Sequence, residues 1–123
     1  MNLVDSSGWL EYFGSGINAG IFASAIENTK ELIVSTINLY EVYKKVLTER
    51  NENNALEAIG FMQQAKVIDV DISISIQAAG ISYLNKLPMA DSIIYTTALQ
   101  NDAILWTQDI DFKGLPYVKL INK

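Results

Sequence analysis

Short apolar runs alternate along the chain with longer stretches in which apolar residues recur every three or four positions. The short runs are bounded by polar and turn-forming residues, which is typical of buried strands. They predict strands over residues 2–4, 31–35, 66–70, 103–107 and 117–121. The longer stretches have the spacing of helices with one buried face. They predict helices over residues 8–13, 17–27, 37–50, 53–65, 72–84 and 88–101.

The turns between these elements carry helix-boundary signals. Ser6 or Ser7 suits the N-cap of the first helix, and Pro88 suits the first turn of the last one. Strands that alternate with helices indicate a parallel sheet with helices on both faces. We therefore predict an α/β fold, a three-layer α/β/α sandwich around a central, mostly parallel sheet of four to five strands. No repeat or linker interrupts the pattern, so residues 1–123 are expected to form a single domain.

Composition narrows the chemistry that such a fold can carry. Of the 123 residues, 50% are hydrophobic and 19% are charged, which is typical of a globular protein with a packed core. The chain has no cysteine and no histidine, which excludes disulfides, thiolate metal sites and Ser-His or Cys-His nucleophiles. No apolar stretch approaches the roughly 18 residues of a membrane span, and no signal-like segment follows Met1. We expect a soluble, cytoplasmic protein with no membrane partner.

Acidic residues follow two of the predicted strands directly. Asp5 comes after the first strand, and Asp109 and Asp111 come after the fourth. Open parallel sheets bind ligands at the carboxyl ends of their strands, so these acids fall on one edge of the sheet. They form one site only if the first and fourth strands are neighbours, which the spacing leaves open. Loops carry acids routinely, so a solvated turn is the alternative interpretation.

Two further acids lie on predicted helices. Asp91 falls in the first turn of its helix at the border of an apolar stripe, where it would be partly desolvated. The positive end of the helix dipole also favours an acid there, so a surface role fits the pattern equally well. Glu41 points away from the apolar stripe of its helix, and Lys45 follows four residues later. That spacing alone favours an exposed ion pair worth about 0.2–0.5 kcal/mol.

If these acids lie close together, a bound cation is needed to offset their negative charges. Crowded carboxylates repel one another and take up protons, and a hard dication relieves that repulsion. Oxygen-only ligation suits Mg²⁺ or Mn²⁺ better than zinc. Such an ion activates water and stabilises the leaving oxygen of a phosphodiester. The net charge of −5 is compatible with this chemistry, whereas a simple nucleic-acid coat protein is usually basic.

Four segments carry a family resemblance: VDSSGWLEYF, STINLYEVYKK, KLPMADSIIYTTAL and ILWTQDIDFKGLP. They extend over nearly the whole chain. In these segments and their order the chain resembles the PIN-domain family and, within it, the VapC-type toxin ribonucleases of VapBC toxin–antitoxin systems. The resemblance implies a PIN-like fold and a metal-dependent endoribonuclease that hydrolyses RNA phosphodiesters with Mg²⁺ or Mn²⁺.

The resemblance also implies roles for individual residues. The implied catalytic residues are Asp5, Glu41, Asp91 and Asp109. Asp5, Asp91 and Asp109 would bind the metal. Glu41 would complete the metal shell or orient the attacking water, which reverses the preference for an ion pair. The supporting positions are Ser6, Thr107 and Asp111, of which Asp111 is the most peripheral.

The expected partners follow from the same resemblance. Basic side chains near the acids are candidates for RNA contacts, although each one alone is more typical of a solvated surface: Lys44, Lys45, Arg50, Lys86 and Lys113. A cognate VapB-type antitoxin and a second copy of the chain, in a homodimer, are the expected protein partners. Apolar residues of the first two helices would either form the core or contact such partners: Trp9, Tyr12, Phe13, Ile21 and Phe22.

Two other functions are compatible with parts of the pattern. A PIN-like fold without catalysis would serve as a protein- or nucleic-acid-binding module, which has no need of four ionised acids on one edge. A phosphate-accepting receiver domain shares the open parallel sheet, but it requires an acidic pair at the first strand, where this chain has the single Asp5. Binding of Mn²⁺ separates the nuclease from the binding module.

Overall fold

The computed structural model describes all residues from Met1 to Lys123. Its five strands form one sheet in the order β3-β2-β1-β4-β5, and every neighbouring pair is parallel. The strands are β1 (Asn2–Val4), β2 (Leu32–Ser35), β3 (Lys66–Ile68), β4 (Ile104–Thr107) and β5 (Val118–Leu120). The first and fourth strands are therefore neighbours, and Val4 pairs with Trp106.

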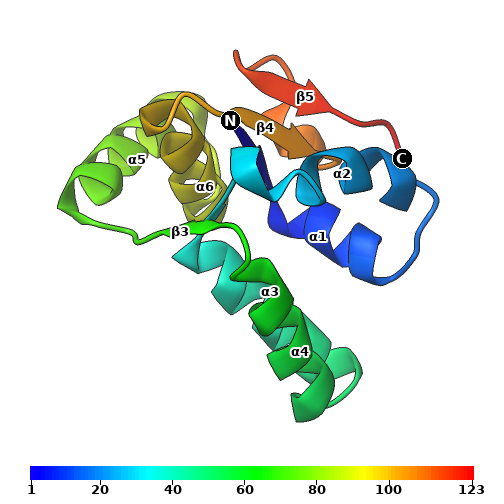
Figure 1. The fold of residues 1–123 in the computed structure, drawn as a ribbon. Coiled ribbons are helices and arrows are strands. Elements are labelled where there is room, and N and C mark those ends of the chain that lie inside the picture. The colour runs from blue at the N-terminus through cyan, green and yellow to red at the C-terminus, as the bar shows by residue number, and fades with distance from the viewer.

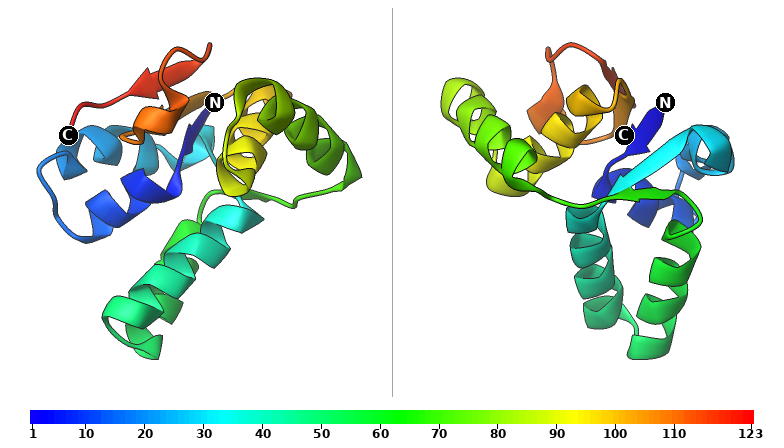
Figure 2. Two further views of the ribbon diagram at one scale, coloured as in Figure 1. Left: turned by 180° about the vertical axis from the view of Figure 1, so that it is seen from behind. Right: turned by 60° about the vertical axis from the view of Figure 1, so that its left-hand side comes forward.

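Helices cover both faces of this sheet (Figure 1). They are α1 (Ser6–Phe13), α2 (Ala19–Ile26), α3 (Thr36–Glu49), α4 (Glu52–Met62), α5 (Ile72–Asn85) and α6 (Met89–Gln100), with two 3₁₀ turns, η1 (Thr29–Glu31) and η2 (Ile110–Phe112). α1 and α2 lie on one side and α5 and α6 on the other, while the α3–α4 hairpin extends away from the sheet (Figures 1 and 2). The predicted three-layer α/β/α architecture is confirmed.

Successive residues of the central strands contribute to two separate cores. Neighbouring side chains of a strand point to opposite faces, so Val4 and Val34 pack with α1 to α4, whereas Leu3 and Ile33 pack with α6 and η2. All four side chains are at most 1% exposed. Burial on both faces explains why these strands read as continuous apolar runs in the sequence.

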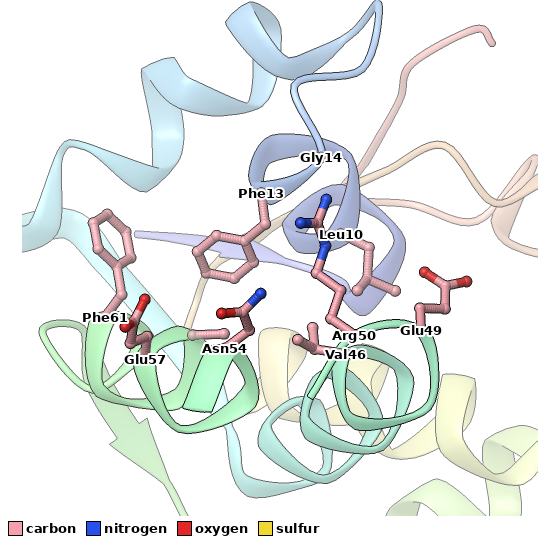
Figure 3. A pocket seen from close by; sticks show the side chains of 10 residues that line it. Leu10, Phe13, Gly14, Val46, Glu49, Arg50, Asn54, Glu57 and Phe61 are labelled. Carbon is pink, nitrogen blue, oxygen red and sulfur yellow. The ribbon is translucent and has the colours of Figure 1, made fainter. Parts of the chain in front are cut away.

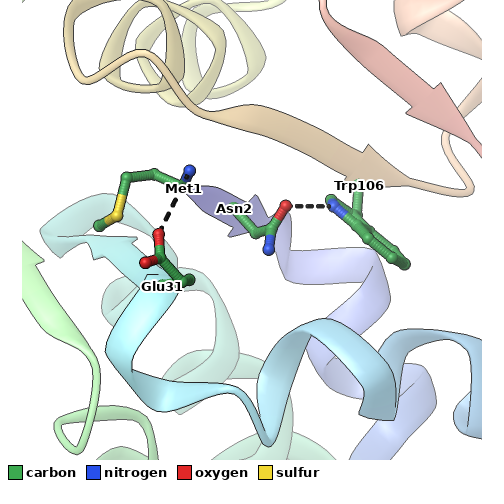
Figure 4. A network of polar contacts seen from close by, with 4 residues as sticks. All are labelled: Met1, Asn2, Glu31 and Trp106. Carbon is green, nitrogen blue, oxygen red and sulfur yellow. Dashed lines mark hydrogen bonds and ion pairs between the residues drawn. The ribbon is translucent and has the colours of Figure 1, made fainter.

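Side chains also hold the beginning of β1 in place (Figure 4). The amino group of Met1 lies 3.6 Å from a carboxylate oxygen of Glu31, which precedes β2. The indole Nε1 of Trp106 in β4 donates a hydrogen bond of 3.0 Å to Oδ1 of Asn2. Together with the backbone ladder, these contacts join β1 to both neighbouring strands and fix the point at which Asp5 leaves the sheet.

The first helix begins differently from the prediction. Asp5 is its N-cap, because its carboxylate accepts a hydrogen bond of 2.9 Å from the backbone N–H of Gly8. The predicted caps Ser6 and Ser7 lie inside the helix instead. Serine and aspartate are both good caps, and the pattern alone does not distinguish them. The correction matters because the capping residue is also a candidate site residue.

Two other helix boundaries also differ from the prediction. The helix predicted from residue 17 begins at Ala19, and Ile17 is 91% exposed because it precedes the helix and its buried stripe. Pro88 is the N-cap of α6 rather than a residue of its first turn. None of the helices combines the length and apolar character that crossing a bilayer requires.

Candidate metal centre

Several elements bring acidic residues to the carboxyl edge of the sheet. β1 leads directly into Asp5, and β4 leads through Thr107 to Asp109. β2 ends at Ser35, which is the N-cap of the helix that carries Glu41. Asp91, in the first turn of α6, completes the set. The adjacency of β1 and β4 therefore supplies the condition under which the acids share one site.

Asp5 lies at the back of this site and is only 3% exposed. Its Oδ1 accepts hydrogen bonds from the Ser7 hydroxyl at 2.7 Å and from Gly8 N–H, and its Oδ2 accepts one from the Thr107 hydroxyl at 2.5 Å. These bonds use three of about four lone-pair sites of a carboxylate. Burial raises the pKa of Asp5 to about 6 against the lowering effect of these bonds, and the charge of Asp109 adds to the rise.

Thr107 links the acids of the two strands. Its hydroxyl is fully buried, donates to Asp5, and accepts a hydrogen bond of 2.9 Å from the backbone N–H of Asp109. One side chain thus sets the position of a carboxylate after β1 relative to the backbone after β4. This is the location expected for a supporting residue of the site.

Three carboxylates lie close together at this edge, and this group does not include Asp5 or Glu41. Asp91, Asp109 and Asp111 each offer an oxygen, and these three oxygens all lie within 4.8 Å of one another. The backbone N–H of Asp111 donates a hydrogen bond of 2.9 Å to Oδ1 of Asp109, so the turn at η2 brings both aspartates together. Asp111, a predicted supporting position, therefore lies beside Asp91 and Asp109, although its side chain is exposed.

Asp91 is the most perturbed member of the cluster. Partial burial raises its pKa to about 7, and the negative charges of four other acids contribute to the rise: Asp109, Glu41, Asp111 and Asp5. The two ion pairs of the protein, Met1–Glu31 and Lys45–Glu49, lie elsewhere. The repulsion is therefore not compensated by a cationic side chain. An uncompensated, oxygen-only cluster fits a hard divalent cation such as Mg²⁺.

Glu41 faces the site rather than Lys45. Its Oε1 accepts a hydrogen bond of 2.7 Å from the hydroxyl of Ser6, the first residue of α1. Lys45 instead pairs with Glu49, one turn further along α3, at 3.0 Å. The ion pair that the helical spacing favoured is therefore absent. Contact with a residue 35 positions away in the chain determines where the carboxylate points.

Asn38 is a residue of this edge that the sequence patterns did not indicate. Asn38 is fully buried, and its side-chain amide donates a hydrogen bond of 3.1 Å to the Ser6 hydroxyl. The available signal was the spacing from Ser35 to Asn38, which is that of a capping box at the beginning of α3. A capping box indicates a helix start, and it does not reveal that the same amide reaches another element.

The basic candidates for RNA contacts lie at different distances from the acids. Lys44 is less than one turn beyond Glu41 on α3 and lies over the Tyr40 ring, 5.9 Å from its centroid. Lys86 and Lys113 are exposed at the ends of α5 and η2. Arg50 follows the far end of α3, about 13 Å along the helix axis from Glu41. Lys45, the remaining candidate, pairs with Glu49 on the same helix.

A parallel α/β sheet with acids gathered at its carboxyl edge defines the general class of the protein. The family model described as PIN domain matches residues 3–116 of this chain. The chain belongs to the PIN domain family, and the predicted family resemblance is confirmed. No curated protein sequence matches the chain significantly.

Solved structures share the fold at low sequence identity. A toxin–antitoxin complex from Klebsiella pneumoniae contains a chain with a TM-score of 0.80 and 20% identity, and all of both chains is covered. VapC20 of Mycobacterium tuberculosis, described as a toxin that cleaves the sarcin–ricin loop, has a TM-score of 0.79 and 14% identity over 98% of both chains. DNA-bound VapBC from Salmonella typhimurium contains a chain with a TM-score of 0.76 and 17% identity, and the match covers 99% of this chain and 98% of the other. These likenesses establish the fold.

Proposed function

We propose that this protein is a metal-dependent endoribonuclease and the toxin of a type II toxin–antitoxin pair. The observation that carries the proposal is the uncompensated cluster in which carboxylate oxygens of Asp91, Asp109 and Asp111 lie within 4.8 Å of one another. A binding module has no use for such a cluster, which destabilises the metal-free fold. Membership of the PIN domain family and the likeness to toxin structures support the same function.

The residues divide into those that would bind a cation and those that hold them. Asp5, Asp91 and Asp109 would bind Mg²⁺ or Mn²⁺ directly or through water, and Asp111 is close enough to contribute. Glu41 would complete the shell or orient the attacking water. Ser6 and Thr107 hold the carboxylates of Glu41 and Asp5 through the hydrogen bonds described above, and we propose supporting roles for both.

The proposed reaction is hydrolysis of an RNA phosphodiester by water. When bound, the cation would lower the pKa of a ligated water and stabilise the charge on the leaving oxygen. Attack by water on phosphorus with departure of the 3′ oxygen leaves a 5′-phosphate and a 3′-hydroxyl. Lys44, Lys86 and Lys113 would contact the phosphate backbone. With an RNA substrate, we place the protein in the cytoplasm.

Cleavage of labelled RNA tests this function. We expect the wild-type protein to cleave in Mg²⁺ or Mn²⁺ and to be inactive in a chelator. Asp91→Asn should lower the rate at least a hundredfold, because it removes a carboxylate from the centre of the cluster. Asp102→Asn is the matched control, because it removes an exposed acid just before β4, and asparagine tolerates the positive φ of 51° at this position.

Equal cleavage by the wild-type protein, Asp91→Asn and Asp102→Asn would show that a contaminant cuts the RNA. Cleavage by the wild-type protein that persists in the chelator would contradict a metal-dependent mechanism. Both results concern the purified protein, so they do not depend on the identity of its cellular RNA target.

We further propose that an antitoxin occupies a hollow between α1 and the α3–α4 hairpin (Figure 3). The hollow measures about 430 Å³, and its apolar lining includes Leu10, Phe13, Val46 and Phe61. Of the aromatic residues noted on the first helices, Trp9 and Phe22 are core, whereas Phe13 is partly exposed at this hollow. An amphipathic helix of a VapB-type protein would bury these side chains, and Arg50 at the rim would contact an acidic residue of it.

A homodimer is the second proposed assembly, and α5 supplies its surface. Four large side chains of this helix are mostly exposed: Ile72 at 84%, Ile76 at 71%, Tyr83 at 85% and Leu84 at 78%. No charged residue occurs in α5. Three of these side chains, Ile72, Ile76 and Tyr83, recur at helical spacing and so share one exposed apolar face, whereas Leu84 lies beside it.

The order of residues along α5 suits a second copy of the chain. Ile72, Ile76, Ala79 and Tyr83 lie on one face at helical spacing, opposite the buried Ile74 and Ala78. In an antiparallel pair related by a two-fold axis, the isoleucines of one copy would pack against the tyrosine of the other, with the small Ala79 near the axis. Such self-complementarity favours a homodimer over an unrelated partner.

A further inference from the structure

Asn38 takes part in two hydrogen-bonded systems at once. It is the third residue of α3, and its Oδ1 accepts a hydrogen bond of 3.0 Å from the backbone N–H of Ser35. Its Nδ2 donates one of 3.1 Å to the Ser6 hydroxyl. Ser6 in turn donates one of 2.7 Å to Oε1 of Glu41. A single fully buried amide thus joins the cap of α3, the first residue of α1 and a site carboxylate.

The direction of every bond in this chain of contacts is determined by its first member. The backbone N–H of Ser35 can only donate, so it must meet the carbonyl oxygen of the Asn38 side chain. The NH₂ group is then left to face Ser6, where it can only donate. The Ser6 oxygen accepts from that group, and its own single proton is directed at Glu41. Asn38 therefore sets the orientation of the Ser6 hydroxyl.

We propose that Asn38 is a positioning residue that acts through Ser6 to hold the carboxylate of Glu41 towards the acidic cluster. This proposal rests on the proposed nuclease function for the role of Glu41. Glu41 is only partly buried and lies near other negative charges, so a carboxylate without a fixed donor would turn towards solvent. Groups that orient metal-site carboxylates typically change activity or metal affinity by 10–100-fold when they are removed.

Steady-state cleavage of RNA by four single variants and one double variant tests the proposal. Asn38→Ala and Ser6→Ala should each lower kcat about tenfold and leave KM unchanged, because substrate contacts stay in place. The double variant should be no worse than either single variant, since both changes interrupt the same chain of hydrogen bonds. Ser6→Thr keeps a hydroxyl donor at this position and should recover part of the kcat that Ser6→Ala loses.

Ser35→Ala is the matched control for helix capping. It removes the serine hydroxyl that accepts from Ile37 N–H, and it leaves the contact between Asn38 and Ser6 in place. We expect it to lower Tm by several degrees, as Asn38→Ala does, while kcat stays within twofold of the wild-type value. Equal losses of kcat in both variants would reduce Asn38 to a helix cap and overturn the proposal. So would a roughly hundredfold loss in the double variant.

A second measurement does not depend on cleavage. In metal-free protein, Glu41→Gln should change Tm by a different amount in the Asn38→Ala background than in the wild-type background, because the amide acts on the bond that Glu41 accepts. Additive changes in Tm would overturn the proposal even if the protein is an active nuclease. If the wild-type protein does not cleave RNA, the proposed function fails, and this thermal comparison still decides whether Asn38 positions Glu41.

Discussion

Asp91 lies in the first turn of α6, where the helix dipole favours a carboxylate, yet its pKa is raised to about 7. Burial and the charges of neighbouring acids outweigh the dipole. In a chelator, the group therefore costs the folded state free energy at neutral pH. Retaining such a residue makes sense if a bound cation offsets the repulsion, which is the usual conflict between stability and function at an active site.

The pH dependence of stability tests this cost. The pKa of Asp91 is raised from 3.8 in the unfolded chain to about 7 in the folded protein. The folded state therefore binds more protons between these values, and wild-type stability should fall as the pH rises from about 4 to 7. Asp91→Asn removes this penalty. In a chelator at pH 8, it should be more stable than the wild-type protein by on the order of 1–2 kcal/mol after solvent screening.

Thermal unfolding across pH 4 to 8 measures this difference. The advantage of Asp91→Asn should shrink towards pH 4, where the aspartate of the wild-type protein is protonated in the folded state. Asp102→Asn should track the wild-type protein at every pH. A variant that is less stable than the wild-type protein at pH 8 would contradict the assignment of Asp91 to a repulsive cluster.

The surroundings of Glu41 and Asp111 were not evident from the sequence of the elements that carry them. Glu41 looks like a surface ion-pair partner from its own helix, because helical spacing describes neighbours on that helix and not Ser6 of α1. Only the family resemblance pointed to the site. Asp111 was predicted to be peripheral, and the η2 turn brings it against Asp109. Asp109 was easier to predict, because it comes just after the end of β4, whereas Thr107 was identified only through the family resemblance.

At the scale of elements, periodicity predicted all five strands and six helices, with most boundaries within two or three residues. The prediction succeeded because a buried strand and a helix with one buried face each require a regular spacing of apolar residues along the sequence. α5 is different. It has apolar residues all round, as a buried helix does, yet one face is solvated in the single chain. The helix itself was predicted, but its unpartnered face was not.

The mass in solution tests the dimer proposed for α5. At tens of micromolar protein, light scattering should give twice the 13.7 kDa of one chain. Ile76→Glu should give the mass of one chain, because it places a charge in the middle of the apolar face. Leu56→Glu, which alters a 53% exposed residue of α4, should remain dimeric. A wild-type protein with the mass of one chain would contradict the dimer, and so would an unchanged mass for Ile76→Glu.

At the scale of the whole molecule, the order of the strands in the sheet brings the residues of the site together. The sequence predicts which residues follow each strand, but it does not state which strands are adjacent, because many orders satisfy the same alternation of elements. The order β3-β2-β1-β4-β5 places β1 beside β4 and so brings Asp5 to Thr107 and Asp109. The strand order thus brings the acids together, and the proposed metal centre depends on the complete fold.

Calorimetric titration of metal-free protein with Mn²⁺ at pH 7.5 tests this claim most directly. We predict saturable binding below millimolar concentration by the wild-type protein and by Asp102→Asn. Asp91→Asn and Asp109→Asn should bind at least tenfold more weakly, because each removes an oxygen ligand from the cluster. Absence of binding at millimolar Mn²⁺, or equal binding by all four proteins, would contradict the account of this edge as a metal centre.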